Sequence, residues 1–295
     1  MALSIKDIKN ITFGIIGLGL IGGSYAKALK NLGVKNIIGV DTNKIVALMA
    51  LDEGFITEAC FTEPLDALKK CDVIISTLYP GVLVDFVKKN QKYFKDEVLF
   101  TDVTGIKGNL LTKVDKALAG KGDFVAGHPM AGREGKGYGQ SAAEIFNGAN
   151  YIVIDRGNNK KENVQWLKEF AYLLGCKNVV EITPKEHDEI IAYTSNLPHA
   201  MAVCLINSDS MTKNTKYFIA GSFRDATRVA DINEILWADL FLFNKDNVIG
   251  EIDKLEEQLE MWKAALAKED KTKLIDMMEK AKAKRKDLFN AKNYR

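Results

Sequence analysis

The chain has 295 residues, of which 47% are hydrophobic, so it is long enough to bury a large core and predicts about two domains. Its 41 basic and 39 acidic residues nearly cancel, which excludes the strong positive field typical of proteins that bind nucleic acid or a membrane surface. Small molecules and a second copy of the chain are the expected partners.

The four cysteines are scattered along the chain and form no C-x-x-C pair, and no histidine stands at metal-ligand spacing from them. We therefore expect reduced thiols and no metal site. No apolar run approaches the roughly 20 residues that a membrane-spanning helix needs, and the pattern of a signal peptide is missing. A cytoplasmic protein is the resulting expectation.

Short β-branched runs alternate with helical patterns up to residue 182. This alternation is typical of a parallel sheet covered by helices on both faces, so an α/β domain is predicted over residues 1–182. The expected strands lie at 11–16, 37–40, 73–78, 98–103, 124–126, 151–154 and 179–182.

A glycine-rich loop follows the first expected strand and opens the first helix. Gly17, Gly19 and Gly22 allow a tight turn, close approach of the backbone to a pyrophosphate and close packing of helix on strand. Asp41 ends the second strand, where a carboxylate accepts hydrogen bonds from the adenine ribose and repels a 2′-phosphate. The combination predicts a Rossmann domain that binds NAD in preference to NADP. Further expected cofactor contacts are Leu20, Ile21, Thr77 and Asp102.

Ligands of a doubly wound sheet bind beyond the carboxyl ends of its strands, and the loop 127–134 is expected there. This placement brings His128 near the nicotinamide. Imidazole titrates near working pH, so His128 is the expected general base. By contrast, His187 lies among charged residues in the first turn of a helix, and we expect a solvent-exposed side chain.

After residue 182 the strand patterns stop, and an all-α helical domain is predicted over residues 183–295. Thr183 and Pro184 supply a capping hydroxyl and a proline at the first helical position. Farther on, in the segment after residue 245, six apolar residues recur at alternating steps of four and three, a pattern that fits packing within the chain and a dimer interface equally well. They are Val248, Ile252, Leu255, Leu259, Trp262 and Leu266.

The helical half also carries candidate anion-binding residues. Arg224 and Arg228 are four residues apart and share one helix face, and a guanidinium suits bidentate binding of a carboxylate. The alternative is a surface ion pair with Asp225 or Asp231, which suits Arg224 better. His199 follows a proline inside a helical pattern, where packing at a kink and contact with a ligand both remain open.

Taken in order, these motifs resemble the prephenate dehydrogenase family of tyrosine biosynthesis, which includes cyclohexadienyl and arogenate dehydrogenases. The resemblance covers essentially the whole chain. It implies an NAD-binding Rossmann domain, a helical domain that forms a homodimer, and an active site between them. The matching segments are 17–24, 101–102, 128–132, 197–199 and 223–228.

The resemblance also implies roles for the candidate residues. His128 would take the proton of the substrate's ring hydroxyl, Arg228 would bind a carboxylate and His199 would line the substrate pocket. Glu134 and Asp225 would gate or orient the site.

One position departs from the family pattern. Many members carry a serine directly after a glycine in the loop beyond Asp102, where this chain has Thr104 followed by Gly105. Either Thr104 supplies the missing hydroxyl, which would make it a catalytic residue, or the contact is absent. Asn196 also stands where some members have a second histidine.

The implied reaction is the oxidative decarboxylation of prephenate, driven by aromatisation of the ring. Arogenate, with an amine in place of the keto group, is the alternative substrate, although no acidic residue dedicated to that amine stands out. A β-hydroxyacid dehydrogenase or imine reductase would share the domain plan without explaining His128 and Arg228 together. A nucleotide-sensing regulatory protein is the alternative that is not an enzyme.

Overall fold

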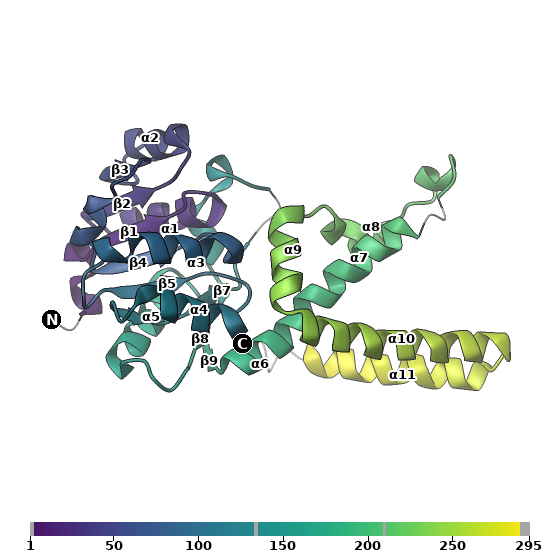
Figure 1. The fold of residues 1–295 in the computed structure, drawn as a ribbon. Helices are drawn as coiled ribbons and strands as arrows, with labels where there is room; N and C mark the ends of the chain where they lie inside the picture. The colour runs from purple at the N-terminus through teal and green to yellow at the C-terminus, as the bar shows by residue number, and fades with distance from the viewer. Residues whose placement is uncertain (1–2, 133–134, 209–210, 290–295) are drawn as a thin grey trace. The chain divides into compact units, whose positions relative to one another are not determined.

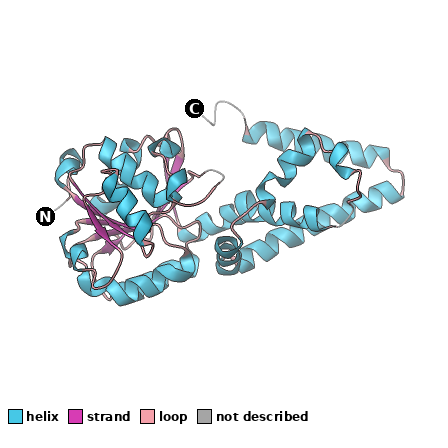
Figure 2. Ribbon diagram, turned by 90° about the horizontal axis from the view of Figure 1, so that it is seen from above, coloured by secondary structure: helices cyan, strands magenta, loops and turns pink. Residues whose placement is uncertain are grey.

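The computed structural model describes residues 3–132, 135–208 and 211–289. The chain forms two compact units, residues 1–245 and 246–295, and each is described by itself. All strands lie in the first unit, as the magenta arrows of Figure 2 show, whereas the second unit is helical. Within the described residues, none of the helices combines the length and the apolar character needed to cross a membrane.

The first unit contains a six-stranded sheet in the order β3-β2-β1-β4-β5-β6, and every neighbouring pair is parallel. The chain starts at the centre with β1 and moves first to one side and then to the other. This doubly wound order confirms the predicted Rossmann fold. The strands are β1 (Thr12–Ile16), β2 (Asn36–Val40), β3 (Glu58–Cys60), β4 (Val73–Ser76), β5 (Leu99–Asp102) and β6 (Asp123–Phe124).

Helices cover both faces of this sheet (Figure 1). Successive strand residues point to opposite faces, so Ile15 packs with α1 and α5, whereas its neighbour Ile16 packs with α3 and α4. Because both faces are buried, the strands are nearly continuous apolar runs. These helices are α1 (Leu20–Asn31), α2 (Lys44–Asp52), α3 (Pro80–Asn90), α4 (Gly108–Leu118) and α5 (Lys161–Leu173).

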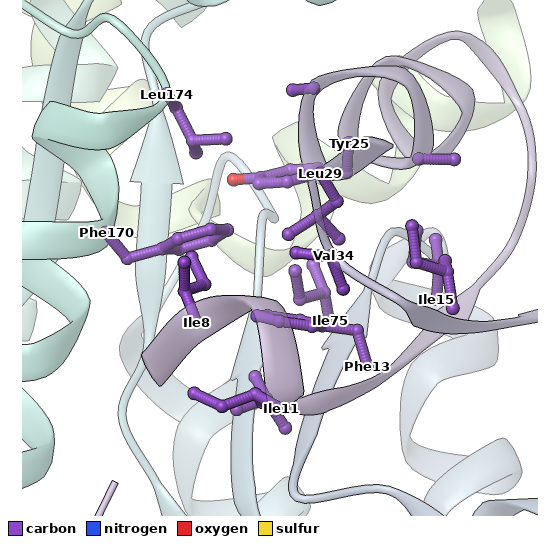
Figure 3. Packing of buried hydrophobic residues seen from close by; sticks show 14 of the residues in the cluster. Ile8, Ile11, Phe13, Ile15, Tyr25, Leu29, Val34, Ile75, Phe170 and Leu174 are labelled. Carbon is purple, nitrogen blue, oxygen red and sulfur yellow. The ribbon is translucent and has the colours of Figure 1, made fainter. Parts of the chain in front are cut away.

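Aromatic rings stack among aliphatic side chains in the core on the α1 and α5 face (Figure 3). The ring of Phe13 from β1 stacks on Phe170 from α5, with centroids 5.8 Å apart. Phe170 in turn stacks on Tyr25 from α1. This packing fixes the helix that follows the glycine loop against the central strand.

A second, three-stranded sheet was not predicted. It has the order β7-β8-β9, with β7 (Gly127–Pro129) antiparallel to β8 (Asn150–Ile154), and β8 parallel to β9 (Asn178–Ile182). The chain passes between the sheets at Val125, whose N–H donates to Phe100 of the first sheet, and Ala126, whose carbonyl accepts from Ile154 of the second. The two last expected strands are therefore present but lie in a different sheet from the one expected.

Four further helices complete the first unit: α6 (Pro184–Ile191), α7 (Leu197–Asn207), α8 (Gly221–Thr227) and α9 (Glu234–Phe243). The predicted start of α6 is confirmed, because the Thr183 hydroxyl accepts a hydrogen bond from the N–H of Glu186. A π-helical turn, Ala192–Asn196, joins α6 to α7 just before Pro198, which has no N–H to donate. The predicted boundary at residue 182 thus marks the change from strands to helices, while the compact units divide at Lys245.

The second unit consists of α10 (Lys245–Ala267) and α11 (Lys271–Leu288). Asp270 caps α11 by accepting a hydrogen bond from the N–H of Lys273. Short helical turns elsewhere lie at Ile5–Asn10, Asp66–Lys70, Gln91–Tyr93, Tyr138–Gln140, Ala143–Phe146, Thr215–Tyr217 and Arg228–Ala230.

Candidate functional site

A cavity of ≈ 350 Å³ lies in the first unit, beyond the carboxyl ends of β1, β4 and β5. Segments from the α/β part form one wall and segments from the helices form the other. The first wall contains residues 21, 77–80, 103–105 and 128–132, and the second contains residues 191, 195–196, 236–237 and 240. The cavity therefore lies where a doubly wound sheet binds its ligands.

Helix α9 is held across this cavity by two polar contacts with the start of α3. The carboxylate of Asp239 accepts a hydrogen bond of 3.0 Å from the N–H of Gly81. The side-chain amide of Asn233 donates to the hydroxyl oxygen of Tyr79, also at 3.0 Å. These contacts place Trp237 in the cavity wall, a residue that the sequence analysis did not single out.

The glycine loop has the shape that dinucleotide binding requires. Gly17 has a φ of 88°, which favours glycine, and a Cβ at Gly22 would lie 1.8 Å from the carbonyl oxygen of Gly17. A Cβ at Gly19 would meet no atom within 4 Å, so the backbone there is open to a ligand. The hydroxyl of Thr77 donates to the Gly17 carbonyl at 2.8 Å. Thr77 and the predicted Ile21 both line the cavity, whereas Leu20, the first residue of α1, is not part of the lining.

Asp41 lies where the sequence analysis placed it, directly after β2. Its carboxylate accepts hydrogen bonds from the N–H groups of Leu18, at 2.7 Å, and Asn43, at 2.8 Å. The carboxylate is thereby fixed beside the glycine loop and remains partly exposed. This position suits recognition of a ribose and opposes an additional phosphate.

Asp102 occupies a different environment from the one expected. Its carboxylate is fully buried and forms an ion pair with the equally buried Lys107, at 2.8 Å. The Lys107 ammonium also donates to the carbonyl oxygen of Gly127, at 2.7 Å. Asp102 thus supports the cavity wall from behind, and its predicted contact with the cofactor stays a prediction.

Thr104 lines the cavity, and its hydroxyl contacts two acceptors of the protein itself. One is the carboxylate of Asp102, and the other is the carbonyl oxygen of Ile106, at 2.8 Å. The hydroxyl proton is therefore already used within the loop. A role of Thr104 in the reaction stays a prediction.

His128 lies on β7 in the cavity wall, and its ring is joined to a second histidine. Nδ1 of His128 is 2.9 Å from Nε2 of His187, whose Nδ1 is 2.7 Å from a carboxylate oxygen of Asp188. Burial, together with the neighbouring His187 and Lys107, holds the pKa of His128 well below its usual range. The ring is therefore neutral at pH 7 and can accept a proton.

The expectation of a solvent-exposed His187 was wrong, since its side chain is only 1% exposed. Burial lowers the pKa of His187, although the hydrogen bond to Asp188 opposes this change. One signal in the sequence could have revealed the burial. His187 precedes Ile191 by one helical turn, and both face inward on α6.

His199 lies next to the cavity and not in its wall. Its ring stacks on Trp237 with centroids 3.6 Å apart, and its Nδ1 donates to the carbonyl oxygen of Ser195 at 2.8 Å. Burial lowers the pKa of His199, and the nearby positive charge of Arg228 adds to this effect. The structure thus brings the predicted His199 and Arg228 together beside a residue of the cavity wall.

The remaining predicted residues either do not line the cavity or lie outside the residues that the structure describes. Arg224 and Asp225 are exposed on α8, and, among the described residues, the cavity lining includes neither of them. Glu134 lies outside the described residues, so its predicted role is not addressed. The described residues contain no group of three or more His, Cys, Asp or Glu side chains arranged to hold a metal ion.

Two family models match adjacent parts of this chain. The model described as the nucleotide-binding domain of prephenate dehydrogenase matches residues 25–181, and the model described as its dimerization domain matches residues 183–280.

Individual relatives agree with these matches. The prephenate dehydrogenase of Bacillus subtilis is 32% identical over 277 residues, which are 92% of this chain and 74% of that protein. The cyclohexadienyl dehydrogenase of Zymomonas mobilis is 27% identical over 89% of this chain and 90% of that protein. A similar fold is found in a crystal structure of prephenate dehydrogenase from Aquifex aeolicus in complex with hydroxyphenyl propionate and NAD+. The match has a TM-score of 0.87 and 28% sequence identity, and it covers 98% of this chain and 100% of the Aquifex chain.

The close contact at Gly22 gives a direct test of the glycine loop. We expect Gly22→Ala to weaken NAD binding by roughly tenfold or more, about 1.4 kcal/mol, because the new Cβ forces the Gly17 carbonyl to move. Gly139→Ala is the matched control, since a Cβ at Gly139 would meet nothing within 4 Å. Titration of both variants with NAD, followed by fluorescence, measures the difference. Equal affinities for the two variants would contradict the assignment of this loop.

Proposed function

Since the chain belongs to the prephenate dehydrogenase family, we propose that it catalyses the NAD-dependent oxidative decarboxylation of prephenate to 4-hydroxyphenylpyruvate. The observation that supports this most directly is His128, a neutral imidazole in the wall of a cavity at the carboxyl ends of the strands. Bound NAD supplies the acceptor for the hydride. The task left to the protein is to orient the substrate and remove one proton.

In this proposal Nε2 of His128 accepts the proton of the substrate's ring hydroxyl. The O–H bond breaks, a bond to Nε2 forms, and the electron pair left on oxygen becomes the carbonyl bond as the hydride departs. Loss of the ring carboxylate as carbon dioxide then gives the aromatic product. A base with a pKa below working pH is present in its active form at neutral pH, although it is a weaker base than a free imidazole.

Substrate binding is assigned to Arg228 and His199. The charge of Arg228 acts on His199, whose ring stacks on Trp237 of the cavity wall, and a guanidinium is suited to bidentate binding of a carboxylate. Asp225, one turn before Arg228, is proposed to orient this site.

The lining of the cavity favours prephenate over arogenate. Within the described part of the chain, the lining residues include no aspartate or glutamate. An ammonium group in place of the keto group would therefore lose its hydration without meeting a carboxylate. A parallel assay with both acids and with NAD and NADP would decide this point, and faster turnover of arogenate would contradict the proposal.

We further propose that the protein works as a homodimer formed through the helices of the second unit. The apolar pattern on α10 divides into two parts: Val248 is buried, whereas Leu259, Trp262 and Leu266 are 53%, 37% and 58% exposed. Exposed apolar residues that repeat along one helix are typical of an interface. We therefore propose that the Val248 end of the pattern packs within the chain and that the exposed end contacts a second copy.

The role of His128 predicts a specific kinetic change. We expect His128→Asn to lower kcat by about 10²- to 10⁴-fold and to change KM little, because the base acts mainly in the transition state. Reduction of NAD by prephenate, followed by absorbance, measures both constants. An unchanged affinity for NAD serves as the control for folding. Turnover close to that of the unmodified enzyme would remove His128 from the reaction.

The proposed role of Arg228 predicts the opposite kinetic change, a larger effect on KM than on kcat. Arg228→Ala should raise KM for prephenate by roughly 10- to 100-fold, the loss expected for a charged hydrogen bond, with a smaller effect on kcat. Arg224→Ala, one turn away and also exposed, is the control and should leave KM nearly unchanged. If both substitutions raise KM equally, general electrostatics and not a specific contact is responsible.

Two substitutions on α10 test the proposed dimer. Trp262→Glu should convert a dimer into a monomer, because it places a charge in the proposed apolar interface. Lys263→Gln, at the adjacent exposed position, should leave the dimer intact. Sedimentation equilibrium distinguishes the two states, and a Trp262→Glu protein that stays dimeric would place the interface elsewhere.

A further inference from the structure

We propose that His187 and Asp188 are positioning residues that fix the tautomer of His128, so that Nε2 of His128 presents its lone pair to the substrate. The inference rests on the proposed function, in which His128 takes the proton of the ring hydroxyl. It assigns a role to two residues of α6 that the sequence analysis left outside the site.

The three side chains form a continuous chain of hydrogen bonds. Asp188 and His187 are both buried, 4% and 1% exposed, and the two contacts of 2.7 Å and 2.9 Å lead from the carboxylate to Nδ1 of His128. The same carboxylate oxygen accepts a hydrogen bond of 2.9 Å from the N–H of Lys107 at the start of α4. Asp188 is thus fixed from two sides.

The hydrogen-bonding capacity of each group determines the position of every proton. An ionised carboxylate only accepts, so Nδ1 of His187 carries a hydrogen and donates it to Asp188. A neutral imidazole has one N–H, so Nε2 of His187 must accept. His128 therefore donates from Nδ1, and its own Nε2 remains without a hydrogen.

The free nitrogen of His128 faces the cavity. A Cβ added at Gly105, a residue of the cavity wall, would lie 3.7 Å from both Nε2 and Cε1 of His128. A side chain at position 105 would thus be in van der Waals contact with this edge of the ring. The edge that bears the lone pair is therefore the one that a ligand in the cavity can reach.

The charges around the two rings support neutral histidines before the reaction. Lys107 acts on both rings from the start of α4 and disfavours a further positive charge, while Asp188 and Asp102 act on His187 in the opposite direction. Burial adds to the effect of Lys107. If His187 were doubly protonated, it would donate to His128 and force the hydrogen of that ring onto Nε2, where it would block proton transfer.

Proton transfer strengthens this arrangement. When Nε2 of His128 takes the substrate's proton, the ring becomes an imidazolium that still donates from Nδ1 to His187. The positive charge is then stabilised through His187 by the carboxylate of Asp188, and no proton has to leave His128. The same hydrogen bonds that select the tautomer are therefore stronger in the transition state.

Two amide variants of the full-length enzyme test this role. His187→Asn places its amide near the position of Nδ1 and so keeps a donor for Asp188, but it ends too far from His128 to accept. His187→Gln is one methylene longer, which brings its amide oxygen to the position of Nε2. We expect His187→Asn to lower kcat for prephenate by roughly 10- to 100-fold with KM nearly unchanged, and His187→Gln to recover most of the loss.

Equal losses in the two variants, or no loss in His187→Asn, would overturn the proposal, because a purely structural role does not depend on the acceptor for His128. Affinity for NAD, measured on both variants, shows whether each one folds.

A second measurement does not depend on activity. The chain contains three histidines, so nitrogen-15 NMR of the ring nitrogens can be assigned by substitution. At pH 7 we expect the His128 ring to carry its hydrogen on Nδ1 in the unmodified protein and in His187→Gln, and to mix tautomers in His187→Asn. A hydrogen on Nε2 in the unmodified protein would overturn the proposal. Correct tautomers without turnover of prephenate would instead contradict the proposed function alone.

Discussion

The site depends on one buried ion pair, between Asp102 at the end of β5 and Lys107 at the start of α4. Both side chains are fully buried, and the pair is completed by the Lys107 ammonium bonding to the carbonyl of Gly127, directly before His128. The N–H of Lys107 also holds Asp188. Removal of either charged partner would leave the other buried without compensation, at a cost of about 3–5 kcal/mol. A single lysine thus joins the first sheet, the second sheet and α6.

This junction explains why the catalytic candidate lies on a short strand of the second sheet. His128 follows the residue that Lys107 holds, pairs with Ile152 of β8 and meets His187 of α6. The backbone of His128 is therefore held by the second sheet and its ring by His187, while the edge with Nε2 lies near Gly105 in the cavity wall. The nucleotide half of the site depends instead on local geometry, because the glycine loop and Asp41 hold one another through the N–H of Leu18.

Sequence reasoning predicted the parts of the site that local spacing encodes. The glycine loop, Asp41 and the capped start of α6 at Thr183 were predicted because each depends on residues a few positions apart or on a strand end. The burial of His187 was missed because the charged residues around it outweighed its one-turn spacing to Ile191, and its hydrogen bond to His128 joins residues 59 positions apart. The partner of Asp102 could not be predicted either, since a buried lysine is rare and Lys107 lies in a loop with the composition of a surface turn. The short strand β7 also escaped prediction, because three residues are too few to show an alternation of apolar and polar side chains.

The central claim is that a neutral His128 in the cavity wall is the base, and the dependence of kcat/KM on pH tests it most directly. Since the pKa of His128 lies well below that of a free imidazole, about 6.5, the deprotonated form should persist as the pH falls. The acidic limb of the profile should therefore have its midpoint clearly below pH 6.5. A midpoint at or above that value would show that a group in the ordinary range controls the reaction, and would contradict the account.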